Sequence, residues 1–165
     1  MRALRRRRLR RRCLELARDL PLPAPFDVHE LCRRVAARRG RPMLLVPVAG
    51  LTGVCGLWIA TGATDLICYE RDTTRPHQDH IILHELSHVL CDHLPVDLAD
   101  STHAQALFPD LDPAMVRAVL GRAGYSSEQE REAETLASVI RQRATTRADG
   151  TLRARLHDAL DGDGG

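Results

Sequence analysis

Residues 80–93, HIILHELSHVLCDH, place a glutamate between two histidines in a run otherwise rich in Ile, Leu and Val. His84 and His88 are four residues apart, which stacks their side chains on one face of an α-helix. Two imidazoles there can bind one cation at metal–nitrogen distances of ~2.0–2.1 Å. Glu85 is rotated by about 100° from His84, so it suits a base beside the metal better than a third ligand. The stretch predicts either a metal site or a core helix whose histidines are hydrogen-bonded.

A further ligand is expected from a second stretch, SSEQEREAETLASVI at residues 126–140. Catalytic zinc sites have three protein ligands and one open position. Glu130 and Glu134 share one face of the helix predicted there, so either carboxylate can complete the site while the other orients a ligand histidine. Ser127 and Glu130 also match a capping box, which would give Glu130 a structural role instead.

Three residues near the HExxH motif compete for the metal. If His80, Cys91 or His93 took the open position, the site would be a closed structural site rather than a catalytic one. His80 is expected at the margin of the site. His93 is expected at the end of the helix, where a histidine interacts favourably with the helix dipole. The HExxHxxGxxH pattern is absent, because position 91 is Cys and position 94 is Leu.

The composition indicates one folded domain. The chain has 165 residues, 44% of them hydrophobic and 28% charged, which is enough for an apolar core. All 24 basic residues are arginines and eight of them lie in the first twelve positions, so the remainder is net acidic. Nucleic-acid binding by the core domain is therefore not expected. Five scattered cysteines without a CxxC pattern predict reduced thiols in a cytoplasm, and no signal peptide or membrane span is expected.

The order of the predicted elements is helices, then a small antiparallel sheet, then helices, which defines an α+β domain. Asp27 and Gly40 are typical of the two ends of a helix. The predicted elements are helices at 3–20, 28–39, 74–93, 113–124 and 128–143, a strand at 41–48, a hairpin at 56–70 and one more short helix after Thr145. The predicted organisation is a basic N-terminal helix or arm (1–25), the main domain (26–145) and a partly disordered tail (146–165).

Two segments together resemble the ImmA/IrrE-type metallopeptidases. They are YERDTTRPHQDHIILHELSHVLCDH at 69–93 and YSSEQEREAETLAS at 125–138. In that family an HExxH helix follows a hairpin and precedes a helix of the form ExEANxFA. The likeness covers about residues 26–143. Glu134 stands where the family has Asn, Leu136 stands where it has Phe, and SVIRQRA replaces the usual LLMP.

The resemblance implies a zincin-like fold around an HExxH active-site helix. It implies one Zn²⁺ per chain held by His84, His88 and Glu130, with Glu85 as the catalytic base. Glu134 would orient a ligand or replace Glu130 as the third ligand. The implied activity is that of a bacterial, cytoplasmic metalloendopeptidase, whose protein substrate is a helix-turn-helix repressor in regulated proteolysis.

Other residues are candidates for contacts with the substrate. Tyr69, His80 and Tyr125 are candidate donors to a developing oxyanion. The strand around residues 66–69 is expected to be an edge strand that holds an extended peptide. No membrane partner is expected. The alternative function is a non-catalytic module of zincin fold that binds a regulatory partner, and the intact Glu85 argues against it, because a binding module needs no base.

Overall fold

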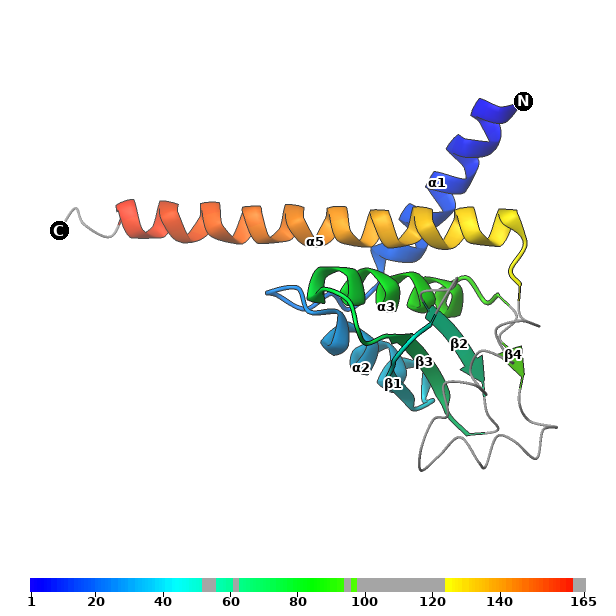
Figure 1. The fold of residues 1–165 in the computed structure, drawn as a ribbon. Helices are drawn as coiled ribbons and strands as arrows, with labels where there is room; N and C mark the ends of the chain where they lie inside the picture. The colour runs from blue at the N-terminus through cyan, green and yellow to red at the C-terminus, as the bar shows by residue number, and fades with distance from the viewer. Residues whose placement is uncertain (52–55, 61–62, 94–95, 98–123, 162–165) are drawn as a thin grey trace.

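The structure, a computed structural model, describes residues 1–51, 56–60, 63–93, 96–97 and 124–161 (Figure 1). The described elements are α1 (Arg2–Arg18), α2 (Val28–Arg39), β1 (Met43–Val48), β2 (Gly56–Ala60), β3 (Asp65–Glu70), α3 (Arg75–Leu90), β4 (Val96–Asp97) and α5 (Ser127–Asp161). The α+β prediction is confirmed. The helix predicted at 113–124 falls almost entirely outside the described residues, as does Cys55. No described helix is both long and apolar enough to cross a bilayer.

The ends of α2 confirm the predicted caps. The Asp27 carboxylate accepts a hydrogen bond of 2.8 Å from the Glu30 backbone N–H, which satisfies one of the free donors of the first turn. Gly40 ends the helix with φ 63°, in the left-handed region where glycine has no Cβ to clash. The helix is therefore fixed at both ends by local contacts that the sequence makes visible.

The sheet is mixed, so the prediction of an antiparallel sheet is wrong. Its strand order is β1-β3-β2-β4. Only the hairpin of β2 and β3 is antiparallel, while β1 runs parallel to β3 and β4 runs parallel to β2. Because β3 inserts between β1 and β2, it is a central strand and not the expected edge strand. Its continuous apolar run, DLICY, is typical of a strand with neighbours on both sides.

Helix α3 lies between the sheet and α5 and forms the centre of the core (Figure 1). It packs against β2 and β3 on one side and against α5 on the other. The largest fully buried apolar side chains come from these elements and from α2, and they include Leu31, Ile59, Ile67, Ile82, Leu83, Leu86, Leu136 and Ile140. The core is built from aliphatic residues, as the low aromatic content requires.

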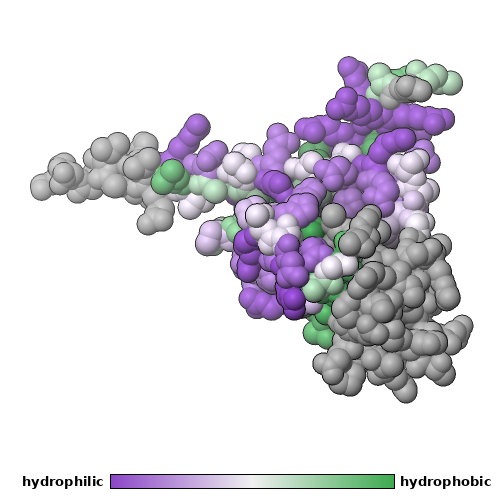
Figure 2. All heavy atoms as spheres, viewed as in Figure 1, coloured by the Kyte–Doolittle hydropathy of each residue, from purple (hydrophilic) through white to green (hydrophobic). Residues whose placement is uncertain are grey.

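Helix α1 joins this core through its C-terminal half. Cys13 and Ala17 are fully buried, and α1 packs against α5. The surface of α1 is hydrophilic over most of its length (Figure 2), as its arginines require. The basic N-terminal segment is therefore a helix with one packed side, and most of its described arginines are exposed.

Helix α5 is longer than the sequence predicted. It continues from Ser127 to Asp161 without a break, so the separate short helix expected after Thr145 is part of the same helix. Its second half extends away from the rest of the domain (Figure 1). Residues 162–165, which were expected to be disordered, lie outside the described residues.

The capping box of α5 is shifted by one residue from its predicted position. The Gln129 backbone N–H donates to Ser126 Oγ at 3.2 Å, and the Ser126 N–H donates to Gln129 Oε1 at 2.9 Å. The pair is thus Ser126–Gln129 and not Ser127–Glu130. The carboxylate of Glu130 is consequently free of the cap.

The observed capping box predicts different effects on stability for substitutions of the two neighbouring serines. Ser126→Ala removes the acceptor for the Gln129 N–H and should lower the free energy of unfolding by about 0.5–2 kcal/mol, as loss of an N-cap does. Ser127→Ala, at the first helical residue, should change it by less than about 0.5 kcal/mol. Urea unfolding followed by circular dichroism measures both, and an equal or larger loss in Ser127→Ala would contradict the assigned cap.

Candidate metal centre

Two helices far apart in the sequence bring three potential ligands together. His84 Nε2 lies 3.1 Å from His88 Nε2 and 3.2 Å from Glu130 Oε2. His88 Nε2 lies 3.8 Å from Glu130 Oε1. The two histidines come from α3, where four-residue spacing puts them on the face that packs against α5. Glu130 comes from the first turn of α5, and it reaches the site because Gln129 makes the cap in its place.

These separations fit a divalent cation. Ligand atoms at ~2.0–2.2 Å from a tetrahedral zinc ion lie about 3.3–3.6 Å from one another, close to the three distances of this group. All three ligand atoms lie within 4.8 Å of one another. Burial and, to a smaller extent, the neighbouring His84 and His93 together lower the pKa of His88 to about 3. A neutral imidazole keeps the lone pair that a metal requires.

Glu134 lies on the other side of His84. Its Oε2 is 3.5 Å from His84 Nδ1, the ring nitrogen that faces away from His88 and Glu130. A carboxylate in this position accepts the Nδ1–H and leaves Nε2 unprotonated for a metal. The same oxygen lies 3.8 Å from His80 Nε2, and Arg141 contacts His80 Nδ1 at 3.1 Å. Glu130 therefore lies among the potential ligand atoms, Glu134 lies beside the second ring nitrogen of His84, and His80 lies at the margin.

Glu85 points into the protein beneath β2. It is 5% exposed. Burial, together with the nearby Glu130 carboxylate, raises its pKa to about 8 against the opposing effect of a hydrogen bond from the Trp58 backbone. Its Oε2 is buried and has no hydrogen-bond partner among the described residues. A buried, unsatisfied carboxylate oxygen is costly, and beside a cluster of metal ligands it fits a proton acceptor for a water molecule.

The two tyrosines considered as oxyanion donors lie in different surroundings. Tyr125 stacks on the His88 ring, with ring centroids 3.6 Å apart. Its hydroxyl is buried without a described hydrogen-bond partner, and burial, together with Glu85 and Glu130, raises the pKa of Tyr125. Tyr69 belongs instead to the apolar core cluster. Only Tyr125 therefore has the surroundings expected of a donor at the site.

Sequence reasoning missed the role of Gly56, the first residue of β2. A Cβ at this position would lie 2.5 Å from Ile81 Cγ2, 2.8 Å from Glu85 Oε1 and 2.9 Å from Glu85 Cγ. Only a glycine lets the β2 backbone pass this close to α3. The sequence signal is a glycine inside a strand, which often marks close approach of another chain segment.

The alternative fourth ligands do not converge on this group in the described part of the chain. His80 points to Glu134 and Arg141. Cys91 and His93 belong to a separate group with Glu132, whose ligand atoms also lie within 4.8 Å of one another. The described residues thus supply three ligands to the first group, as an open site needs.

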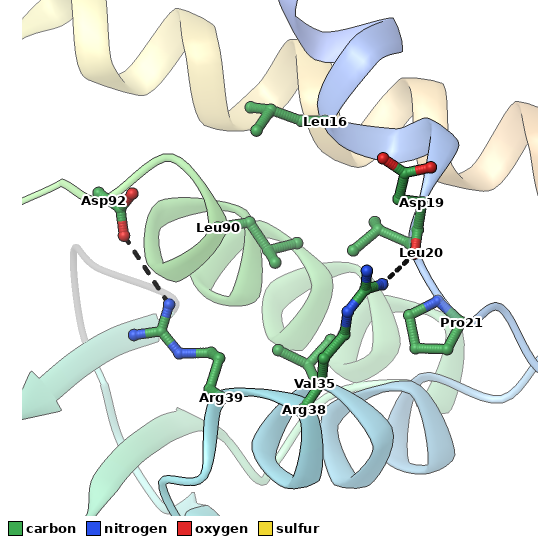
Figure 3. A pocket seen from close by; sticks show the side chains of 9 residues that line it. All are labelled: Leu16, Asp19, Leu20, Pro21, Val35, Arg38, Arg39, Leu90 and Asp92. Atoms are coloured by element: carbon green, nitrogen blue, oxygen red, sulfur yellow. Dashed lines mark hydrogen bonds and ion pairs between the residues drawn. The ribbon is translucent and has the colours of Figure 1, made fainter.

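A hollow at the junction of α1, α2 and α3 is separate from this centre (Figure 3). The Arg38 guanidinium donates to the Asp19 carbonyl, and Arg39 pairs with Asp92 at 3.8 Å. Its described lining contains no His, Cys or Glu. Both guanidinium groups are already used in internal contacts, so this hollow adds no chemistry to the centre.

Comparisons with protein-family models, with curated proteins and with solved structures find no match to this chain.

The close approach at Gly56 is testable. Gly56→Ala should lower the free energy of unfolding by about 1–3 kcal/mol, as overpacking of a core does, because the new methyl group meets Ile81 and the Glu85 side chain. Gly124→Ala is the matched control, since nothing lies within 4 Å of a Cβ there. Thermal unfolding measures both, and equal stability of the two variants would contradict the described packing.

Proposed function

We propose that the protein is a zinc-dependent endopeptidase of the ImmA/IrrE type, with a zincin-like fold. The observation that carries the proposal is the convergence of His84, His88 and Glu130 beside a buried glutamate, Glu85, of the same helix. Imidazole nitrogens and a carboxylate suit zinc. A binding module or a structural metal site has no use for a buried carboxylate oxygen that lacks a partner.

The residues have distinct roles in this proposal. A zinc ion at the three ligands would supply Lewis acidity towards a peptide carbonyl and lower the pKa of water. Glu85 accepts the proton of the attacking water and returns it to the leaving amine. Tyr125, whose hydroxyl is buried and unpartnered among the described residues, donates to the oxyanion.

The substrate would bind beside β2 and not beside β3. Among the described strands, β4 pairs with β2 only at Ile59 and Ala60, so the outer edge of Gly56–Trp58 has no strand neighbour in the described residues. An extended peptide that adds to this edge gains backbone hydrogen bonds. It would lie next to Glu85, which contacts both Gly56 and the Trp58 backbone.

The class of substrate rests on the resemblance of residues 69–93 and 125–138 to the ImmA/IrrE-type enzymes. That resemblance supports a helix-turn-helix repressor as the protein substrate and regulated proteolysis as the role. A cut in an extended linker of such a protein fits an edge-strand binding site, because the peptide must be extended to pair with β2.

Metal binding distinguishes the two glutamates of α5. The metal-free protein should bind one equivalent of Zn²⁺ in competition titrations with a chelating dye. Glu134→Gln should weaken binding by ~10–100-fold, as loss of a partner of a ligand histidine does. Glu130→Gln should weaken it more, since it removes a ligand atom. Unchanged affinity in Glu130→Gln would exclude Glu130 as a ligand.

Cleavage tests the catalytic role of Glu85. The zinc-loaded protein is incubated with a random-sequence peptide library, and new termini are read by mass spectrometry. Glu85→Gln should retain one equivalent of zinc and lose cleavage by ~10²–10⁴-fold, as removal of a general base does. Zinc binding without cleavage by the unaltered protein would favour the non-catalytic binding module instead.

A further inference from the structure

A chain of polar contacts runs from the metal centre to the N-terminal helix. His88 Nδ1 lies 2.9 Å from His93 Nδ1. His93 Nε2 lies 3.3 Å from Glu132 Oε2, and Glu132 Oε1 lies 3.1 Å from an Arg12 guanidinium nitrogen. Both histidines are buried, at 0% and 7% exposure. We call these four residues, His88, His93, Glu132 and Arg12, the relay.

The end of α3 positions the His93 ring. The His93 N–H donates to the His88 carbonyl at 3.1 Å, and the Asp92 N–H donates to the Val89 carbonyl at 3.2 Å. Asp92 has φ 54°, so the segment is a Schellman motif with aspartate at the left-handed position. The turn brings the chain back over the last helical residues. The sequence predicted a histidine at the helix end, but not this contact between the two rings.

The contacts determine which nitrogens carry protons. An ionised carboxylate only accepts hydrogen bonds, so Glu132 takes the Nε2–H of His93. The Nδ1 of His93 is then unprotonated and accepts from the Nδ1–H of His88. The Nε2 of His88, which faces His84 and Glu130, is left with a free lone pair.

We propose that Glu132, acting through His93, is a positioning group that holds His88 in the tautomer and orientation required of a metal ligand. Arg12 forms an ion pair with the second oxygen of Glu132. The inference rests on the proposed metal centre and adds residues beyond its ligands. On the other histidine, Glu134 lies directly beside His84 Nδ1 at 3.5 Å, so each of the two histidines has an acceptor near the ring nitrogen that faces away from the centre.

A second metal site at Cys91, His93 and Glu132 is the competing interpretation, since their ligand atoms lie within 4.8 Å of one another. The Arg12 guanidinium at 3.1 Å from Glu132 opposes it, because a cation already occupies that side of the carboxylate. The two interpretations differ on Cys91: it is a ligand in the second site and has no part in the relay. Cys91→Ser is therefore the matched control.

The relay is tested first without metal, by nitrogen-15 NMR of the histidine rings. The unaltered protein should show the Nδ1–H tautomer at His88 and the Nε2–H tautomer at His93. Glu132→Gln should reverse both, because Arg12 retains the amide oxygen and the amide N–H₂ then donates to His93. A purely structural role for Glu132 would leave the tautomers unchanged.

Zinc affinity gives the second measurement. His93→Leu should weaken zinc binding by ~10–100-fold, as loss of a ligand's hydrogen-bond partner does. His93→Asn should recover most of the affinity, because its side-chain oxygen replaces the acceptor Nδ1. Cys91→Ser should bind one equivalent of zinc as the unaltered protein does.

The outcomes separate the relay from the metal centre. If the unaltered protein binds zinc but its His88 is the Nε2–H tautomer, or if His93→Leu binds zinc with unchanged affinity, the relay is wrong and the metal centre remains. If two equivalents bind and Cys91→Ser loses one, the second site replaces the relay. If the unaltered protein binds no zinc, the metal centre and the relay both fail.

Discussion

The packing of α5 against α3 brings three electron-rich side-chain atoms close together, and their mutual repulsion determines the chemistry of the site. It brings the Nε2 atoms of His84 and His88 and the carboxylate of Glu130 within 3.1–3.8 Å of one another. Each of these atoms carries a lone pair or negative charge, so they repel one another unless a proton or a cation lies between them. A partly buried location increases that repulsion, because solvent screens it less.

The two faces of α3 separate the paired histidines from the buried glutamate. One face presents His84 and His88 to α5, while the next residue, Glu85, is turned towards β2. The close passage of Gly56 and the hydrogen bond from Trp58 hold Glu85 away from bulk water. Strand and helix thus create the low-polarity surroundings that raise the pKa of a carboxyl group.

Most features that depend on residues near in sequence are predicted correctly. Features that depend on contacts between distant segments are not. The α2 caps at Asp27 and Gly40 and the start of α3 follow from local chemistry, whereas α3 ends at Leu90 and not at the predicted residue 93. The pairing of β1 with β3 depends on which strand occupies the centre of the sheet, and no local pattern encodes that. The sequence leaves Ser126 and Ser127 open as the cap of α5, because each has a polar partner three residues later, and the capping box predicted at Ser127–Glu130 is off by one position. The contacts of His93 were missed because they need Asp92 in a conformation that aspartate seldom adopts.

One arginine of the basic helix α1 has a structural contact inside the domain. Most of its arginines face solvent, but Arg12 reaches Glu132 of α5, and Cys13 beside it is fully buried with its thiol 3.8 Å from the Glu132 carbonyl. The α1–α5 contact therefore acts on the same residue that contacts His93. A shift of α1 along α5 would move the Glu132 carboxylate, and with it the hydrogen bond that orients His93 towards His88. Arg12, Glu132 and His93 thus connect the basic helix α1 to His88 of the candidate metal centre through side chains in direct contact.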